Sequence, residues 1–318
     1  MAGDFGALEQ FRRELFAHCY RMLGSAEEAE DAVQETYLRA WRSFEGFQGR
    51  ASARTWLYRI ATNVCLTALE SRGRRPLPSG LGQAADDPDE PLQPALDVPW
   101  LRPVPDSLVN DPAATTAMRA GVRLAFVAAL QYLSARQRAV LIMRDVLEWP
   151  AAEVADFLGT TSTAVHSGVR RARAELARAL PDQDELAEPD APEQRAALEK
   201  FIVAITAADA GAMAELLRAD VVLEMPPLAT WFAGASVVTR FVAAHLFTAP
   251  GALRLVPVSA NGQPSVAVYQ RAADGSFHAH AIQVLTITPA GIARIVAFSD
   301  PSLFELFGLP AERAFAEL

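Results

Sequence analysis

Cysteine, lysine and long apolar runs are all scarce in this chain of 318 residues. The two cysteines, Cys19 and Cys65, have no second cysteine or histidine at ligand spacing. This excludes a disulfide framework and a cysteine-based metal site, and we expect two buried free thiols. No stretch of about 18 uninterrupted apolar residues occurs, and the N-terminus lacks the pattern of a secretory signal. We therefore expect a cytoplasmic protein that does not enter the membrane.

Positive charge is also low overall, since the formal net charge is −9 at pH 7. It is concentrated, however, in two segments: residues 46–75 hold six arginines against one acid, and residues 119–180 hold nine against five. Residues 76–111 hold one arginine against seven acids, and residues 181–318 carry eight basic and sixteen acidic residues. The pattern predicts two basic modules, an acidic connector and an acidic tail domain.

Residues 1–75 are expected to form the first module, an all-α domain. Apolar residues recur there at helical spacing, as in Val33, Tyr37, Trp41 and Phe44, which predicts packed helices. Ser25, followed three residues later by Glu28, predicts a capping box at the start of one helix.

Residues 76–113 are dense in proline, glycine and aspartate and cannot hold a regular element for long, so we interpret them as a linker. A purely flexible spacer has no need of apolar residues. The segment nevertheless contains Leu96, Val98, Trp100 and Leu101. We expect part of it to dock on another part of the protein or on a partner.

Residues 114–182 form a second helical block with helix-turn-helix signals. Ser134 is placed to cap one helix, Pro150 suits the first turn of the next, and Gly159 ends that short helix in a tight turn. The last helix then presents one apolar stripe, made of Val165, Val169, Ala172 and Leu176. Two helices joined by a short glycine-containing turn are typical of DNA-binding helix-turn-helix domains.

The sequence pattern changes from purely helical to mixed helical and strand-like in residues 190–318. Helical segments are expected at about 193–207, 209–218 and 234–246, followed by strand-like runs separated by the turn signals "NGQP", "ADGS" and "PAG". Helices followed by an antiparallel meander predict an α+β domain.

The stretch "ARTWLYRIATNV" places Trp56 and Asn63 on one helix face, flanked by Arg54 and Arg59. Arginines bind phosphates, an aromatic ring packs on a base or sugar, and asparagine both donates and accepts hydrogen bonds. The preceding loop adds Phe47 and two glycines, a composition able to offer an aromatic surface to an unstacked base. The alternative is that Trp56 and Phe47 are core residues and that the arginines form a solvated face.

On the last helix of the second block, polar and basic residues lie away from the apolar stripe, where a major groove could be read. They are His166, Ser167, Arg170, Arg171 and Arg173. Similar helical corners occur in proteins that never contact DNA, so this pattern favours DNA binding without establishing it.

Two blocks together resemble the sigma-70 family of RNA polymerase sigma factors, of the extracytoplasmic-function type. They are "EDAVQETYLRAWRSFEGFQGRASARTWLYRIATN" and "LSARQRAVLIMRDVLEWPAAEVADFLGTTSTAVHSGVRRARAEL". The resemblance covers roughly residues 8–75 and 118–180. Two ordered motif sets at the usual separation are more specific than either alone.

The resemblance implies that Asp31, Gln34 and Glu35 dock on the polymerase clamp, and that the Phe47 loop and Asn63 engage the melted minus-10 strand. It also implies that the helix from His166 to Arg173 reads the minus-35 duplex. In relatives the positions of His166 and Gly168 are often basic, so the promoter sequence cannot be predicted.

The tail resembles the SnoaL-like branch of the nuclear-transport-factor-2-like superfamily, through element order and the stretches "PPLATWFAG", "ANGQPSVAVY" and "FSDPSLFELFGLP". Such cone-shaped domains enclose a pocket, near which we place Trp231, His278, His280 and Asp300. Alternate residues share one face of a strand, so both histidines could equally be ordinary half-buried side chains.

These observations predict a multidomain protein, with region 2 at 1–75, a linker at 76–113, region 4 at 114–182 and a SnoaL-like domain at 190–318. We expect a sigma factor that binds core RNA polymerase and promoter DNA and that uses no cofactor, metal or catalytic residue. Its C-terminal domain would regulate it in cis and could hold a small molecule. One alternative is a ligand-sensing helix-turn-helix regulator that acts without polymerase, and another is an isomerase or cyclase active in the tail.

Overall fold

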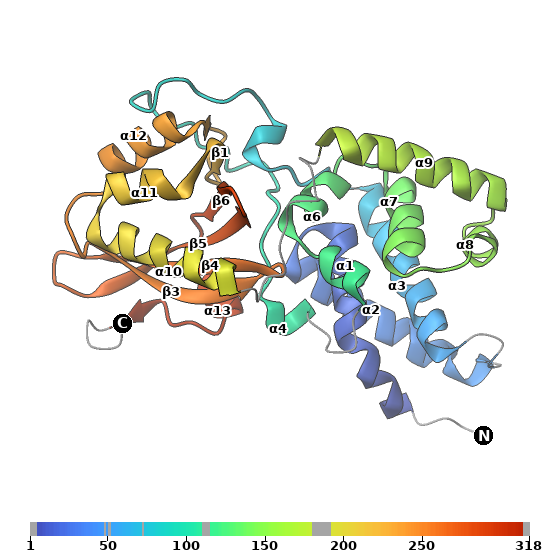
Figure 1. The fold of residues 1–318 in the computed structure, drawn as a ribbon. Helices are drawn as coiled ribbons and strands as arrows, with labels where there is room; N and C mark the ends of the chain where they lie inside the picture. The colour runs from blue at the N-terminus through green and yellow to red at the C-terminus, as the bar shows by residue number, and fades with distance from the viewer. Residues whose placement is uncertain are drawn as a thin grey trace. The chain divides into compact units, whose positions relative to one another are not determined.

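The structure, a computed structural model, describes residues 5–47, 49, 52–71, 73–109, 115–179 and 192–313 (Figure 1). The chain forms two compact units. The first consists of Met1–Arg75 and Asp106–Pro181, and its described part is helical. The second consists of Pro76–Pro105 and Asp182–Leu318 and combines helices with a sheet.

The helical unit begins with a bundle in which α1, α2 and α3 pack on one another. Its elements are η1 (Phe5–Phe11), α1 (Arg12–Leu23), α2 (Ala26–Ser43), η2 (Phe44–Gly46) and α3 (Ala53–Glu70). Ser25 accepts a hydrogen bond from the Glu28 N–H at 3.4 Å, as a helix cap should. The Glu28 carboxylate pairs with Arg75.

The second half of this unit supplies the helix-turn-helix. Its elements are α4 (Asp106–Val109), α5 (Thr116–Ala120), α6 (Leu124–Leu130), α7 (Ala135–Leu141), η4 (Ile142–Val146), α8 (Ala151–Phe157) and α9 (Ser162–Ala179). Ser134 and Gln137 form a complete capping box at α7. Gly159, at φ +61°, makes the turn between α8 and α9. The predicted stripe of α9 is buried, with Val165 at 1% and Ala172 at 0% exposure.

The second unit is the predicted α+β fold. Its elements are η3 (Pro78–Gly80), α10 (Pro192–Ala207), α11 (Ala210–Leu216), β1 (Leu217–Glu224), β2 (Trp231–Ala233), α12 (Ala235–His245), β3 (Leu253–Ala260), β4 (Gln263–Arg271), β5 (Phe277–Thr288), β6 (Gly291–Phe298), α13 (Leu303–Leu306) and β7 (Glu312–Arg313). The sheet order is β2-β1-β6-β5-β4-β3, with β7 paired to β5.

Strands β3 to β6 form the expected antiparallel meander, and β1 joins β6 in parallel. Helices α10, α11 and α12 lie beside the sheet (Figure 1) and share an apolar core with its inner face, including Phe201, Phe241 and Leu285. Asn261 and Gly262 both have positive φ at the β3–β4 turn. That is the backbone an Asn-Gly hairpin turn requires.

The linker docks, as its apolar residues indicate. Trp100 and Leu101 are 8% and 0% exposed, whereas Leu96 remains 81% exposed. The linker bridges to both edge strands of the sheet, since Ala85 pairs with Phe232 and Pro105 pairs with Ala260. Residues 76–105 are therefore a structural part of the C-terminal unit.

Candidate nucleic-acid and polymerase interfaces

The side chains predicted to meet polymerase share one face of α2. Asp31 and Gln34 are exposed, and Glu35 is partly exposed. Glu35 accepts a hydrogen bond from Arg39 at 2.6 Å, and Gln34 donates one to Glu30 at 3.3 Å. Residues three and four apart are neighbours on a helix surface, so the acidic and amide groups form one continuous polar strip.

Two apolar residues of the same motif, for which no separate role was predicted, extend that strip. Leu38 is 50% and Trp41 is 67% exposed. Trp41 recurs with Val33 at helical spacing, but of the two only Val33, at 0% exposure, is buried. An exposed tryptophan beside acids is typical of a protein-binding surface. The quoted motif containing both residues was the available signal.

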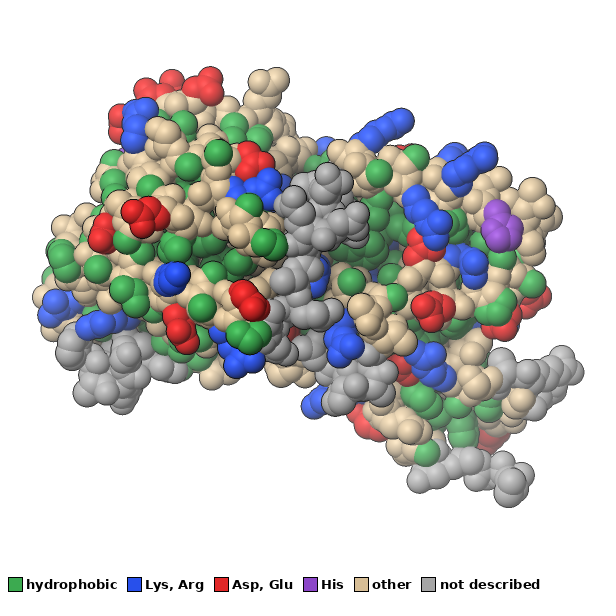
Figure 2. Space-filling view, in the orientation of Figure 1, with side chains coloured by type: hydrophobic (Ala, Val, Ile, Leu, Met, Phe, Trp, Pro, Cys, Tyr) green, Lys and Arg blue, Asp and Glu red, His purple; other side chains and the backbone are tan. Residues whose placement is uncertain are grey.

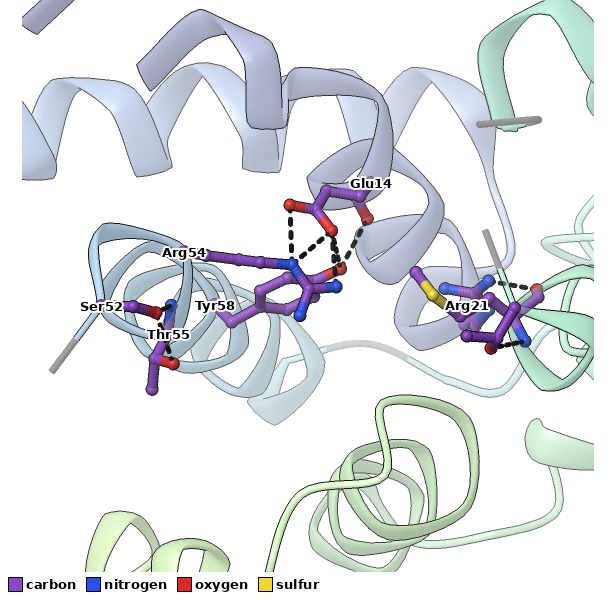
Figure 3. A network of polar contacts seen from close by, with 8 residues as sticks. Glu14, Arg21, Ser52, Arg54, Thr55 and Tyr58 are labelled. Carbon is purple, nitrogen blue, oxygen red and sulfur yellow. Dashed lines mark hydrogen bonds and ion pairs between the residues drawn. The ribbon is translucent and has the colours of Figure 1, made fainter. Parts of the chain in front are cut away.

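Helix α3 is fixed to α1 by a partly buried polar network (Figure 3). The Arg54 guanidinium donates to both carboxylate oxygens of Glu14, at 3.0 and 2.7 Å, and lies over the Tyr58 ring. Burial alone would lower the pKa of Arg54, but the hydrogen bond with Glu14 raises it. Burial raises the pKa of Tyr58. The Arg54 guanidinium is therefore a cation that Glu14 fixes in position at the edge of the predicted DNA face.

The other predicted minus-10 residues lie along α3 and the loop before it. The Phe47 ring stacks on Trp56 at 4.7 Å between centroids, and both are half-buried. Asn63 is exposed. Arg59 donates to Asp156 of α8 at 3.3 Å and faces the Phe157 ring. The structure thus joins Phe47 with Trp56, leaves Asn63 open to solvent and engages Arg59 with the helix-turn-helix.

The predicted minus-35 residues lie on the outer face of α9. His166, Arg170, Arg171 and Arg173 are exposed and Ser167 is partly exposed, and basic side chains gather over this helix (Figure 2). Arg173 makes two hydrogen bonds of 2.8 Å to Asp145, which raise its pKa. Gly168 is buried. A Cβ at this position would lie 3.6 Å from the Val140 side chain, so the position faces the core.

Three of the four residues expected near a C-terminal pocket bond to separate partners. Trp231 donates to the Gly82 carbonyl at 3.1 Å, and Asp300 pairs with Arg102 at 2.7 Å. His278 is exposed and bonds Ser276 at 2.9 Å. Burial lowers the pKa of His280. In the described part of the chain, Trp231, His278 and Asp300 thus bond to groups other than one another.

Comparisons with known proteins agree with this geometry. The Sigma-70 region 2 family matches residues 7–75, and the Sigma-70 region 4 family matches residues 123–176. The ECF RNA polymerase sigma factor SigG of Mycobacterium tuberculosis is 50% identical over 315 residues, which are 97% of this chain and 84% of that protein. The chain belongs to the ECF RNA polymerase sigma factors.

Two further comparisons concern the ECF sigma factor SigJ of Mycobacterium tuberculosis. Its sequence is 29% identical over 248 residues, which are 75% of this chain and 72% of SigJ. Its crystal structure superimposes with a TM-score of 0.66 at 22% identity, covering 97% of this sigma factor and 100% of SigJ. Two helical sigma regions followed by an α+β domain, as the sequence predicted, are confirmed.

Regions 2 and 4 of this sigma factor contact each other through two buried arginines. Arg21 donates to the carbonyls of Met118 and Gly121 at 2.6 and 3.2 Å. Arg138 donates to the Met22 carbonyl and to Gln131. Burial lowers the pKa of both guanidinium groups to about 10. Backbone carbonyls therefore solvate these charges in place of water.

Among the residues that the structure describes, no group of three or more histidine, cysteine, aspartate or glutamate side chains is placed to hold a metal ion. Cys19 and Cys65 are buried and free, as expected. Within the same described ranges, no helix combines the length and apolar character needed to cross a bilayer.

Proposed function

We propose that this sigma factor binds core RNA polymerase in the cytoplasm, recognises the minus-35 and minus-10 promoter elements and promotes initiation of transcription. The observation that carries the proposal is the joint match to regions 2 and 4 in one chain. The exposed α2 strip and the exposed basic face of α9 support it, because each offers a free surface where its partner is expected.

The proposed roles follow the chemistry of each face. Asp31, Gln34 and Glu35 contact the polymerase clamp, and Leu38 and Trp41 add apolar area to that contact. On the minus-10 side, Asn63 hydrogen-bonds a base of the melted strand, while the ring and cations around it support the strand. These are Phe47, Arg54, Trp56 and Arg59. On the minus-35 side, the duplex is read by His166, Ser167, Arg170, Arg171 and Arg173.

The work of this chain is binding, with no bond made or broken. Trp231, His278 and Asp300 bond to Gly82, Ser276 and Arg102 rather than to one another. This supports the reading, because acid and base catalysis needs convergent groups. These three residues and His280 would be the ones to examine for a small-molecule ligand.

The C-terminal domain regulates the sigma regions in cis. It is covalently fused to them and contacts residues 76–105, the segment that joins them. Deleting the residues after about 185 and measuring promoter-dependent transcription tests this role, with circular dichroism to verify that the remaining helices fold. The proposal expects a changed output. Equal output with and without the domain, over several promoters, would remove the regulatory role.

A further inference from the structure

The polar residues of α9 lie in two rows beside its buried stripe. At about 100° per residue, His166, Arg170 and Arg173 fall within roughly 60° of one another. Ser167 and Arg171, four positions apart, form the second row on the other side of the helix. From His166 to Arg173 the first row extends roughly 10 Å, or about three base-pair steps of 3.4 Å. This row is therefore long enough to meet several neighbouring base pairs.

Arg173 differs from the other arginines of this face because a carboxylate holds it. Its Nε donates to Asp145 Oδ2 and its Nη2 donates to Oδ1, both at 2.8 Å. Two parallel hydrogen bonds to one carboxylate fix the plane of the guanidinium as well as its position. Arg170 and Arg171 are exposed, and among the residues that the structure describes neither has an ion-pair partner. Arg173 is thus the oriented cation of the three.

Asp145 lies on a packed element. It belongs to η4, in which Ile142 and Met143 are both 0% exposed. The Leu147 N–H donates to the Ile142 carbonyl and the Trp149 N–H to the Met143 carbonyl, each at 2.9 Å. Helix α7, which continues into η4, packs against α9. The carboxylate therefore has a fixed position beside α9.

The two bonds to Asp145 occupy one edge of the Arg173 guanidinium and leave another. They use the Nε N–H and one Nη2 N–H, so the second Nη2 N–H and the Nη1 N–H groups remain for a ligand. The Arg173 side chain is 65% exposed, against 24% for Asp145, so this edge is open to solvent. It can donate to two acceptors that lie side by side. Guanine presents such a pair in the major groove, O6 and N7.

Net charge separates this arginine from an ordinary phosphate contact. Binding to phosphates depends on net positive charge and on the release of counterions. Because Asp145 neutralises Arg173, the pair as a whole offers a phosphate little attraction. Directional N–H donors at a fixed position suit a base edge instead. Arg170 and Arg171 keep their full charge and suit phosphates.

We propose that Arg173, oriented by Asp145, determines specificity in the minus-35 element by recognising one guanine through its O6 and N7. Asp145 is the positioning residue of this contact, and Arg170 and Arg171 bind neighbouring phosphates. The inference rests on the proposed function and assigns a base to one of the residues that meet the minus-35 duplex.

Selection from randomised minus-35 sequences tests the assignment in the complete holoenzyme. Core polymerase reconstituted with the full chain would be bound to promoter fragments on which it initiates, with the base pairs around minus 35 randomised, and the bound pool would be sequenced. The wild type should enrich guanine roughly ten-fold at one position. Arg173→Ala should lose that enrichment and keep the preferences at the other positions.

Two conservative variants separate orientation from charge. Arg173→Lys keeps the positive charge but lacks the planar fork, so it should lose the guanine preference nearly as fully as the alanine variant. Asp145→Asn removes the charge that holds Arg173 with little change in size. It should lower the enrichment several-fold at the same position only. A merely structural role of Asp145 would instead affect all positions together.

Two arginines of the same helix provide matched controls. Arg170→Ala should weaken binding to all sequences alike and reduce the slope of log affinity against log salt by about 0.9, with the guanine enrichment retained. Arg178 is exposed in the last turn of α9, and Arg178→Ala should leave the enrichment unchanged. Circular dichroism verifies that each variant folds.

A modified base gives a second readout that needs no substitution in the protein. Replacing the enriched guanine by 7-deazaguanine, which lacks the N7 acceptor, should weaken wild-type binding several-fold and have no further effect on Arg173→Ala.

Three results would overturn the inference: no guanine enrichment by the wild type, equal enrichment by the wild type and Arg173→Ala or Asp145→Asn, and equal wild-type binding to guanine and 7-deazaguanine. A chain that does not bind core polymerase, or that initiates on no fragment, would instead overturn the proposed function.

Discussion

At the residue scale, His18 links the stability of region 2 to pH. It is fully buried on α1, with Nε2 2.9 Å from the Thr62 hydroxyl and its ring 5.2 Å from that of Tyr58. Burial, and then the charge of Arg21, lower its pKa from 6.5 to about 3. His18 is therefore neutral in the fold and takes up a proton on unfolding below pH 6.5. Its stabilising effect is complete above pH 6.5 and is lost as the pH falls toward 3.

We predict that the free energy of unfolding falls by about 1.4 kcal/mol more in the wild type than in His18→Gln between pH 7.5 and 5.5. Urea unfolding followed by circular dichroism at the two pH values measures the difference. The glutamine variant is the control, because the remaining titrating groups are common to both proteins. Equal losses in the two proteins would show that His18 is not held neutral.

Substitutions on two exposed faces of region 2 should affect polymerase binding and promoter opening separately. Asn63→Ala removes an exposed amide on the predicted minus-10 face and should lower open-complex formation about ten-fold, the effect of about 1.4 kcal/mol in base contacts. Affinity for core polymerase should stay within about two-fold. Permanganate footprinting reports opening, and fluorescence anisotropy reports affinity for core polymerase.

The double variant Asp31→Ala with Glu35→Ala should show the reverse, a weakened affinity for core polymerase and normal opening once the complex is saturated. If both lesions altered the same step, the assignment of α2 to polymerase and of α3 to DNA would be wrong.

Periodicity alone could predict the buried side of α2, but it could not predict whether Trp41 is buried or exposed. A tryptophan at helical spacing with Val33 meets the rule for a core residue. Whether another element covers it depends on tertiary packing, and here it stays 67% exposed. An apolar side chain favours burial, but it is buried only where another element of the fold packs against it.

At the element scale, two glycines in the helix-turn-helix predict opposite effects of one substitution. Gly168 lies inside α9, where an added Cβ would meet Val140 at an ordinary 3.6 Å. Gly168→Ala should stabilise region 4 by about 0.5–1 kcal/mol, because alanine has the higher helix propensity. Gly159→Ala should destabilise it by about 1 kcal/mol, since φ is +61° there.

Thermal unfolding of the two variants measures these effects, and each serves as the other's control. A gain in stability from both substitutions, or from neither, would contradict the placement of Gly168 inside a helix and of Gly159 in a left-handed turn.

Strand prediction worked where alternation and turn signals agreed, and it failed for β1. The runs that became β3, β4, β5 and β6 are bounded by clear turns such as Asn261-Gly262. Strand β1 follows α11 directly at Leu217, without a turn residue between them, so the expected helix ran past the true boundary. Its pairing with β6 is parallel and distant in sequence, and a local pattern does not contain that information.

At the scale of the whole molecule, segment charge was the informative quantity, since a chain with a net charge of −9 carries two basic modules. The docking of the linker could be expected from Trp100 and Leu101. Its docking site could not, because the bonds of Ser79 to Glu224 and Val104 to Asn261 join residues more than 140 positions apart. Regions 2 and 4 could be assigned together because their two motif sets occur in the usual order along the chain.

Regions 2 and 4, joined by a linker, should bind weakly to DNA in the absence of core polymerase. Each neutralises few phosphates, and avidity arises only when a large partner fixes their spacing. Specificity then belongs to the assembly of sigma factor and polymerase.

Reconstitution with core RNA polymerase tests this central claim most directly, by scoring co-elution and specific initiation from genomic fragments against binding of the purified chain to short promoter duplexes. The account predicts co-elution, initiation at specific sites and weak binding to either duplex alone. Failure to co-elute with core polymerase, or tight binding of the chain to one short duplex without it, would contradict the account.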